Sequence, residues 1–337
     1  MARPTHATDT RGVILIALLW ILTALSVLAL SFSRESFVEV AVARNSSDLC
    51  DAYYIARAGM MATIHQLVQK RFMPQLKQAQ QPGPPDPIDS GMVMGTFADG
   101  TYEVEVQDES GKINLNRVQE EQLRTLIEFV GIQKPDSDII VDSILDWRDA
   151  DSERRVNGAE DGYYQSLNPP YKAKNGNFDS VEELLLVRGV TPDYFYGHRE
   201  KAPDGSIFYK YGLSRCFTVY SGTLGNFGSS VNANYAPLPV LMSISGMTPD
   251  VAQGIIEHRK VKPFQSPAEI SQALGLAAGA PVLSMLSINQ TGAYTLTAHG
   301  RRAGSKVQRI IRAVVIVGPS TMMPYRIVYW NENVPDL

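Results

Sequence analysis

Carboxylates gather in one segment of the chain, between residues 146 and 161. Six acidic side chains fall within these sixteen residues: Asp146, Asp149, Asp151, Glu153, Glu160 and Asp161. The interval from Asp149 to Glu160 overlaps the spacing of an EF-hand loop, but Arg154 stands where that loop needs a glycine, which argues against an EF-hand. An oxygen-rich site for a hard cation such as calcium fits the segment. The alternative is a solvated acidic loop whose counter-charges are Arg148, Arg154 and Arg155.

Residues typical of catalysis do not accompany this segment. The five histidines are scattered, without the spacing of metal ligands: His6, His65, His198, His258 and His299. The sequence also lacks a glycine-rich phosphate loop after a strand and a nucleophile elbow. We therefore predict that the chain is not an enzyme.

The N-terminal part is typical of a membrane segment. An apolar run of 20 residues, from Val13 to Phe32, contains no charge and no proline. A helix of this length, at about 1.5 Å per residue, spans the ~30 Å hydrocarbon core of a bilayer. The residues before it include Arg3, His6 and Arg11, which favours a cytoplasmic N-terminus and a body on the other side of the membrane.

The helix is expected to continue far beyond the membrane. No glycine or proline interrupts the chain from Val13 until Gly59, and apolar residues recur near the 3.6-residue period almost as far as Pro74. This pattern is much longer than the apolar core of a secretory signal peptide. We predict one helix over residues 13–72, with residues 13–32 in the membrane.

Two interpretations of the membrane segment remain, an ordinary signal anchor and the leader of a type IV pilin-like protein. The sequence Arg11-Gly12-Val13 resembles a prepilin site, at which a peptidase cuts between Gly12 and Val13 and removes residues 1–12. The mature helix would then carry Ala17 at its fifth position, where major pilins carry a glutamate. An unpaired carboxylate in hydrocarbon is costly, so its absence fits a subunit with none ahead of it in a filament.

The chain has two cysteines, Cys50 and Cys216. If the body lies outside the cytoplasm, the oxidising environment would allow a disulfide between them. The other interpretation is a pair of free, partly buried thiols. The sequence leaves both open.

Segments of alternating polarity predict an antiparallel sheet. Met92–Ala98 and Tyr102–Asp108 flank Asp99-Gly100, a strong signal for a two-residue hairpin. Four later segments have alternating or β-branched residues: Arg215–Ser221, Ala293–Arg301, Val307–Gly318 and Tyr325–Trp330. One face of this sheet should pack on the distal half of the long helix.

Two helical stretches interrupt the strands and resemble each other. Ile113-Asn114-Leu115-Asn116 and Val231-Asn232-Ala233-Asn234 each precede a helix, a glycine turn and a second helix that ends in arginine. This is the pattern of a duplicated helix-hairpin-helix unit. Such units often bind DNA, which gives the main alternative function, a membrane-anchored DNA-binding protein of a competence-like system. The hairpins carry few cations and the net charge is −4, so no nucleic acid is expected as a partner.

Taken together, the motifs resemble the K-type minor pseudopilins of type II secretion systems. The segments that carry the resemblance are Arg11-Gly12-Val13 and residues 110–116, 144–151, 157–164, 182–190 and 231–234. The resemblance implies an α+β, type IV pilin-like fold with a long N-terminal helix packed on an antiparallel sheet, plus a large helical insertion of helix-hairpin-helix or SAM-like type. The implied boundaries are a leader at 1–12, the helix at 13–72, a pseudopilin α/β domain at 73–109 and 204–337, a helical insertion at 110–203, and a second helical hairpin unit at about 232–287.

The resemblance also implies a function. It implies a structural calcium ion in the acidic segment, with Asp149, Asp151, Glu160 and Asp161 as the candidate ligands. The implied partners are the minor pseudopilins of the I, J and H types, a prepilin peptidase and the inner-membrane secretion platform. The subunit would be anchored in the bacterial inner membrane with a periplasmic body. It would stand at the tip of the pseudopilus, nucleate its assembly and support export of folded proteins across the outer membrane.

Overall fold

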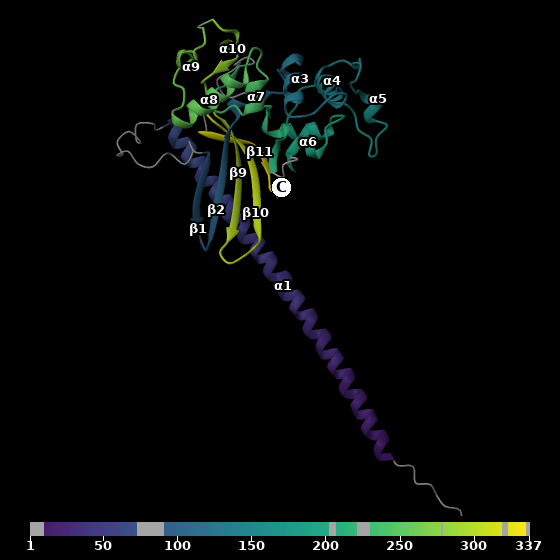
Figure 1. Cartoon of the computed structure of the whole chain (residues 1–337). Coiled ribbons are helices and arrows are strands. Elements are labelled where there is room, and N and C mark those ends of the chain that lie inside the picture. The colour runs from purple at the N-terminus through teal and green to yellow at the C-terminus, as the bar shows by residue number, and fades with distance from the viewer. Residues whose placement is uncertain are drawn as a thin grey trace, which may run out of the picture.

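The computed structural model describes residues 10–72, 91–201, 207–220, 230–277, 279–318 and 323–334. One long helix, α1 (Thr10–Phe72), projects as a stalk from the body, and its second half lies along a sheet (Figure 1). Its last residue confirms the predicted end of the helix. Within the described residues, α1 is the one helix long and apolar enough to cross a membrane.

The sheet beside α1 has five antiparallel strands in the order β1-β2-β9-β10-β11. The bounds of these strands are Met92–Phe97, Gly100–Asp108, Ala293–Arg302, Gln308–Val317 and Tyr325–Asn331. Alternate residues of β9, such as Leu296 and Ala298, share one buried core with Met60 of α1. Gly300 lets β9 approach the helix closely, because a Cβ there would lie 2.3 Å from the carbonyl oxygen of Ala52. The long helix packed on an antiparallel sheet confirms the predicted α+β architecture.

One predicted strand is wrong. In the predicted strand Arg215–Ser221, whose last residue lies outside the described residues, residues 215–220 do not join the five-stranded sheet. Instead, β6 (Phe217–Thr218) pairs in parallel with β3 (Ile113–Asn114) elsewhere in the molecule. Phe217 and Thr218 are both buried. A strand on a one-sided sheet buries alternate residues instead, so this segment belongs to a core that surrounds it.

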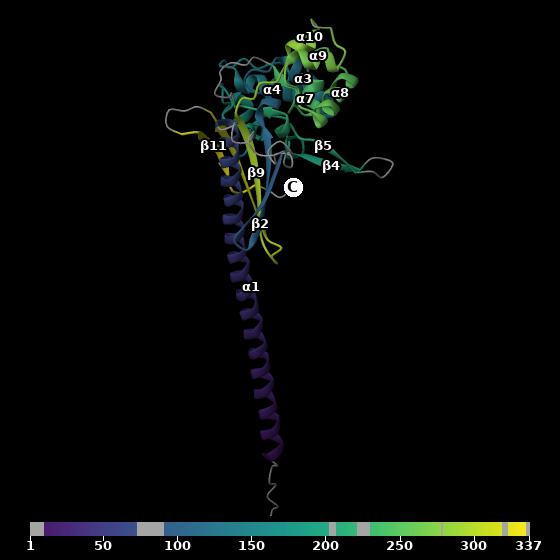
Figure 2. The ribbon, with the colours of Figure 1, turned by 90° about the vertical axis from the view of Figure 1, so that its left-hand side faces the viewer.

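The remaining elements form a head, defined as the described residues between 109 and 288. It lies over the end of the sheet away from the free part of α1 (Figure 1), and the β4–β5 hairpin projects from its side (Figure 2). The helices of the head are α3 (Glu120–Phe129), α4 (Asp136–Arg148), α5 (Asp161–Tyr164), α6 (Pro192–Tyr196), α7 (Leu238–Met242), α8 (Pro249–Val261), α9 (Pro267–Ala273) and α10 (Pro281–Ser284). Its short elements are η1 (Glu109–Gly111), η2 (Val181–Leu186), η3 (Leu213–Arg215), β3, β4 (Gly197–Lys201), β5 (Ile207–Tyr211), β6, β7 (Val231–Asn232) and β8 (Leu286–Ser287).

Two units of the head repeat the same contacts around one hydrophobic core. In the first unit β3 pairs in parallel with β6, and in the second β7 pairs in parallel with β8. The side chain of Asn116 bonds to both the backbone N–H and the C=O of Phe178. In the second unit Asn234 makes the same two bonds to Phe264. The helix-hairpin-helix class of these units stays a prediction.

The two units differ in one connection. At the end of α4, Arg148 donates to two backbone carbonyl oxygens that follow β3, and at the end of α8 Arg259 does the same after β7. From this point the second unit reaches its phenylalanine through residues 260–263, whereas the first unit takes residues 149–177. The acidic segment is therefore an insertion into one copy of a repeated unit, and we call residues 149–177 the inserted loop.

Candidate metal centre

Three carboxylates of the inserted loop converge. One carboxylate oxygen from each of Asp149, Asp151 and Glu160 lies within 4.8 Å of the others. Asp149 is the C-cap residue immediately after α4, and Glu160 is the N-cap residue immediately before α5. These two helices fix the ends of the acidic stretch, so that residues distant in sequence meet.

Glu160 is the most confined of the three. Glu160 is 6% exposed, and neither of its carboxylate oxygens has a hydrogen-bond partner. The Oδ1 atom of Asp149 is also buried without a partner. Burial, together with the negative charges of Asp146, Asp149 and Asp151, raises the pKa of Glu160 to about 7. Buried polar atoms normally have partners, so these oxygens are suited to a positively charged ligand.

The donor set fits a hard divalent cation. Three carboxylates supply oxygen ligands, and calcium takes about six to eight of them, with backbone carbonyls and water completing the shell. A bound cation would also relieve the repulsion within the cluster. The pKa of Asp149 is raised, first by burial and then by the charge of Asp151, which a cation would counter.

Asp161, the fourth predicted ligand, does not join this cluster. Its Oδ1 accepts a hydrogen bond from the backbone N–H of Ala173 at 2.9 Å, and its Oδ2 accepts one from Nε2 of Gln165 at 3.3 Å. Asp161 begins α5, and its carboxylate therefore holds the far part of the inserted loop.

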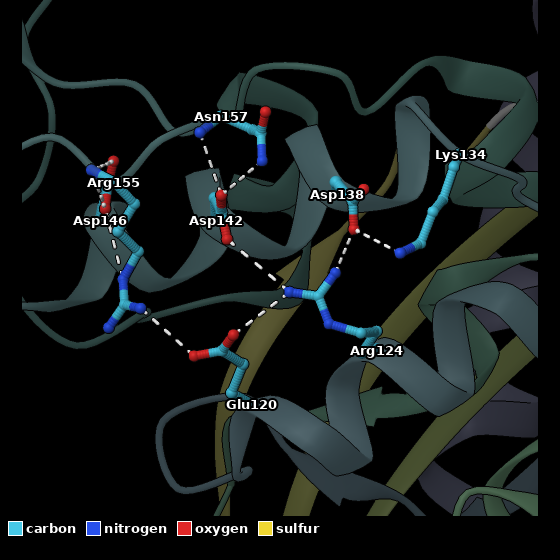
Figure 3. A network of polar contacts seen from close by, with 8 residues as sticks. All are labelled: Glu120, Arg124, Lys134, Asp138, Asp142, Asp146, Arg155 and Asn157. Atoms are coloured by element: carbon cyan, nitrogen blue, oxygen red, sulfur yellow. Dashed lines mark hydrogen bonds and ion pairs between the residues drawn. The ribbon is translucent and has the colours of Figure 1, made fainter.

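Helix α4 holds the inserted loop through two further carboxylates, which sequence reasoning did not assign (Figure 3). The Oδ2 atom of Asp142 accepts hydrogen bonds from the backbone N–H and the side-chain Nδ2 of Asn157, both at 3.0 Å. Asp146 accepts from the backbone N–H of Arg155 at 3.2 Å and lies 3.5 Å from its Nε atom. The signal in the sequence was the four-residue spacing of Asp142 and Asp146, which places them on one helix face.

Two residues outside the inserted loop, Arg188 and Trp147, also contact it. Arg188 donates through Nη1 to the carbonyl oxygen of Gly158 at 2.9 Å, and its guanidinium lies 4.9 Å from the ring centre of Tyr163. Tyr164 packs edge-on against Trp147, with ring centres 5.2 Å apart. The loop thus has a fixed path over the head.

Two family models match the head. Both are described as "Type II secretion system (T2SS), protein K", one over residues 105–196 and the other over residues 231–289. Residues 105–196 and 231–289 therefore belong to the type II secretion system protein K family. The first match contains the inserted loop, and the second covers the repeated unit that lacks it.

Curated relatives carry the same description. Type II secretion system protein K of Pseudomonas aeruginosa is 28% identical over 185 residues, which are 52% of this chain and 49% of the relative. The protein of the same name from Pectobacterium carotovorum is 26% identical over 207 residues, 58% of this chain and 57% of the relative. The chain thus spans about half the length of the curated relatives it matches.

A solved structure has the same fold. A chain in the crystal structure of the GspK-GspI-GspJ complex from enterotoxigenic Escherichia coli matches with a TM-score of 0.56 and 16% identity. The match covers 82% of this chain and 95% of that chain. It confirms the predicted type IV pilin-like fold.

The other predicted site residues lie away from the inserted loop. Gly12 and Val13 are in the first turns of α1, and cleavage between them stays a prediction. The candidate disulfide is wrong, because Cys50 and Cys216 are free thiols in different surroundings. Cys50 is exposed on α1, whereas Cys216 belongs to the core of the head, where burial raises the pKa of its thiol to about 12.

Proposed function

We propose that this chain is a minor pseudopilin at the tip of a type II secretion pseudopilus. It nucleates assembly with minor pseudopilins of the I, J and H types and supports export of folded proteins across the outer membrane. The observation that carries the proposal is a long helix whose apolar surface stays uncovered beyond the length that a membrane would shield.

The free part of α1 supports assembly with other helices. The apolar run that a bilayer would cover ends at Phe32, yet Phe37, Val38, Val40 and Val42 are exposed beyond it. Apolar side chains concentrated on such a surface mark an interaction site. Long helices of neighbouring pseudopilins would cover them. The solved protein of this fold is in a complex with GspI and GspJ, which supports partners of these types.

The head supports a terminal place in the filament. It lies over the end of the sheet opposite the free part of α1 (Figure 1), where a following subunit would otherwise stack. Ala17 supports the same place, because a subunit with none ahead of it has no partner for a charge in the membrane.

We place the chain in the bacterial inner membrane, with a cytoplasmic N-terminus and a periplasmic body. Helix α1 supplies the candidate span, and a prepilin peptidase would cut between Gly12 and Val13 before the inner-membrane platform moves the subunit. A side chain at Gly12 should block the cut. Gly12→Ala is therefore expected to keep residues 1–12, visible by intact mass, and to stop secretion in a strain that lacks its own protein K. If the variant were still processed and still secreted, the leader proposal would be wrong.

Calcium is the cation that we propose for the metal centre. An ion that binds only the folded protein raises its melting temperature by mass action. Wild type should therefore melt at a higher temperature in calcium than in EDTA. Asp151→Ala should remove this difference. In EDTA the variant should melt like wild type, because Asp151 is exposed. Glu153→Ala is the matched control, since Glu153 is an exposed acid of the same loop outside the cluster. Equal melting of wild type in calcium and in EDTA would rule the site out.

A further inference from the structure

The repeated unit shows what the inserted loop does to the face of α4. Counted back from Arg148 and Arg259, which make matching contacts, Asp142 corresponds to Gln253 and Asp146 to Glu257. On α8, Gln253 and Glu257 are exposed and bond to each other at 2.8 Å. On α4 the corresponding acids are 7% and 0% exposed. The inserted loop therefore covers a helix face that the second unit leaves in water.

Nearly all the polar contacts of these two acids go to the loop that covers them. Asp142 receives both donors of Asn157, and Asp146 receives the backbone N–H and the guanidinium of Arg155. Gly158 fits over Asp146 only because it has no side chain, since a Cβ there would lie 1.9 Å from Oδ2 of Asp146. Neither acid is one of the three carboxylates that converge on the cation position.

The residues anchored to α4 lie between the candidate metal ligands in the sequence. Asp149 and Asp151 precede the anchored residues 155–158, and Glu160 follows them. With residues 155–158 fixed to α4, the chain must turn back, and this brings Glu160 to the two aspartates. Without the anchors, the ordering of this stretch would have to accompany cation binding and would cost conformational entropy.

We propose that Asp142 and Asp146 are positioning residues for the cation, which hold the inserted loop in its binding shape and so set the affinity without touching the ion. This inference rests on the proposed calcium site and deepens it. Residues that orient metal ligands in other proteins typically change the affinity by about 10–100-fold when removed.

The test is calcium titration of the full-length protein in detergent by isothermal calorimetry, with melting of each variant in EDTA as the folding control. Asn157→Ala and Asp142→Ala should each weaken calcium binding about 10–100-fold. Gln253→Ala, the matched change on α8, should leave the affinity unchanged. Asp151→Ala, which removes a ligand, should abolish binding.

The outcomes separate the two proposals. If wild type binds no calcium, the metal site itself fails. If wild type and Asn157→Ala bind calcium with the same affinity, the positioning role is overturned. This holds even if the variant melts at a lower temperature in EDTA, because lower melting alone would show only a contribution to folding. Should Asp142→Ala fail to fold, Asn157→Ala decides the question, since it changes the loop and leaves the helix intact.

Discussion

Asp108 is a buried carboxylate outside the inserted loop, at the joint between the sheet and the head. Asp108 is the N-cap of η1, and its Oδ1 accepts hydrogen bonds from the backbone N–H and the hydroxyl of Ser110. Its Oδ2 is buried without a partner. Burial raises the pKa of Asp108 to about 6, and the neighbouring charge of Glu109 adds to the rise. Glu109 itself is paired with Lys112 at 2.5 Å. The joint thus carries a charge that the fold accommodates poorly near neutral pH.

Asp108 predicts how stability depends on pH. Its folded pKa lies above the unfolded value of about 3.9, so the folded state binds a proton that the unfolded state does not between these values. The free energy of unfolding should therefore rise as pH falls from about 7 to about 5, and this gain is lost as pH rises through 6. Asp108→Asn keeps the Ser110 acceptor and removes the charge.

The measurement is melting in EDTA at pH 5.5 and pH 7.5, which avoids competition between calcium and protons. The difference between the two pH values should be smaller in Asp108→Asn than in wild type. It should not vanish, because the pKa of Asp146 is also raised to about 6 and that of Glu160 to about 7. An unchanged difference would mean that Asp108 titrates normally.

At the scale of elements, the two repeated units form an internal comparison. They share the asparagine contacts and the arginine at the helix end, and the second unit is complete without an inserted loop. Folding of the first unit should therefore depend on the shared contacts more than on the loop. The inserted loop adds the three converging carboxylates to a unit that the second copy forms without such a loop.

Replacement of residues 149–177 by the sequence of residues 260–263 tests this view. The shortened protein should remain helical by circular dichroism and melt cooperatively, at a lower temperature because Ala159 and Tyr164 leave the core. Its melting should not respond to calcium. A chain that loses the helical signal of the head would show that the loop is part of the folding unit.

Much of this architecture could be predicted from the sequence where the signals are local. The helix end at Phe72 follows from the proline after it. The signal at Asp99-Gly100 predicts the β1–β2 hairpin, but the turn lies one residue earlier, at Ala98-Asp99, and Gly100 begins β2. The sequence predicts the wrong sheet for residues 217–218. Their partner, β3, lies about a hundred residues earlier, and the pairing is only two residues long. Pairing over such a distance leaves no local pattern.

The candidate site was predictable only in part. Asp149, Asp151 and Glu160 stood out by their charge density and do converge. Asp161 had the same signal, but its place at the start of α5 turns its carboxylate toward Ala173. The role of Asp142 depends on the path of the loop over α4, which spacing along the chain does not reveal.

At the scale of the whole molecule, the two halves of α1 and the head occupy different regions. The free half of α1 presents apolar side chains, the sheet holds the other half, and the head occupies the far end (Figure 1). This arrangement fits the proposed place at the end of a pseudopilus. The central consequence of that proposal is association with other pseudopilins through α1.

Co-purification from membranes tests this consequence most directly. The full-length chain, carrying an affinity tag, would be expressed with the I- and J-type pseudopilins of the same secretion system, and the native mass of the purified particle would be measured. Val40→Asp places a charge on the exposed surface of α1, and Val261→Asp makes the same change at a valine of the head that is even more exposed. We predict that wild type and Val261→Asp carry both partners and that Val40→Asp loses them. Recovery of the wild-type chain without either partner would contradict the account.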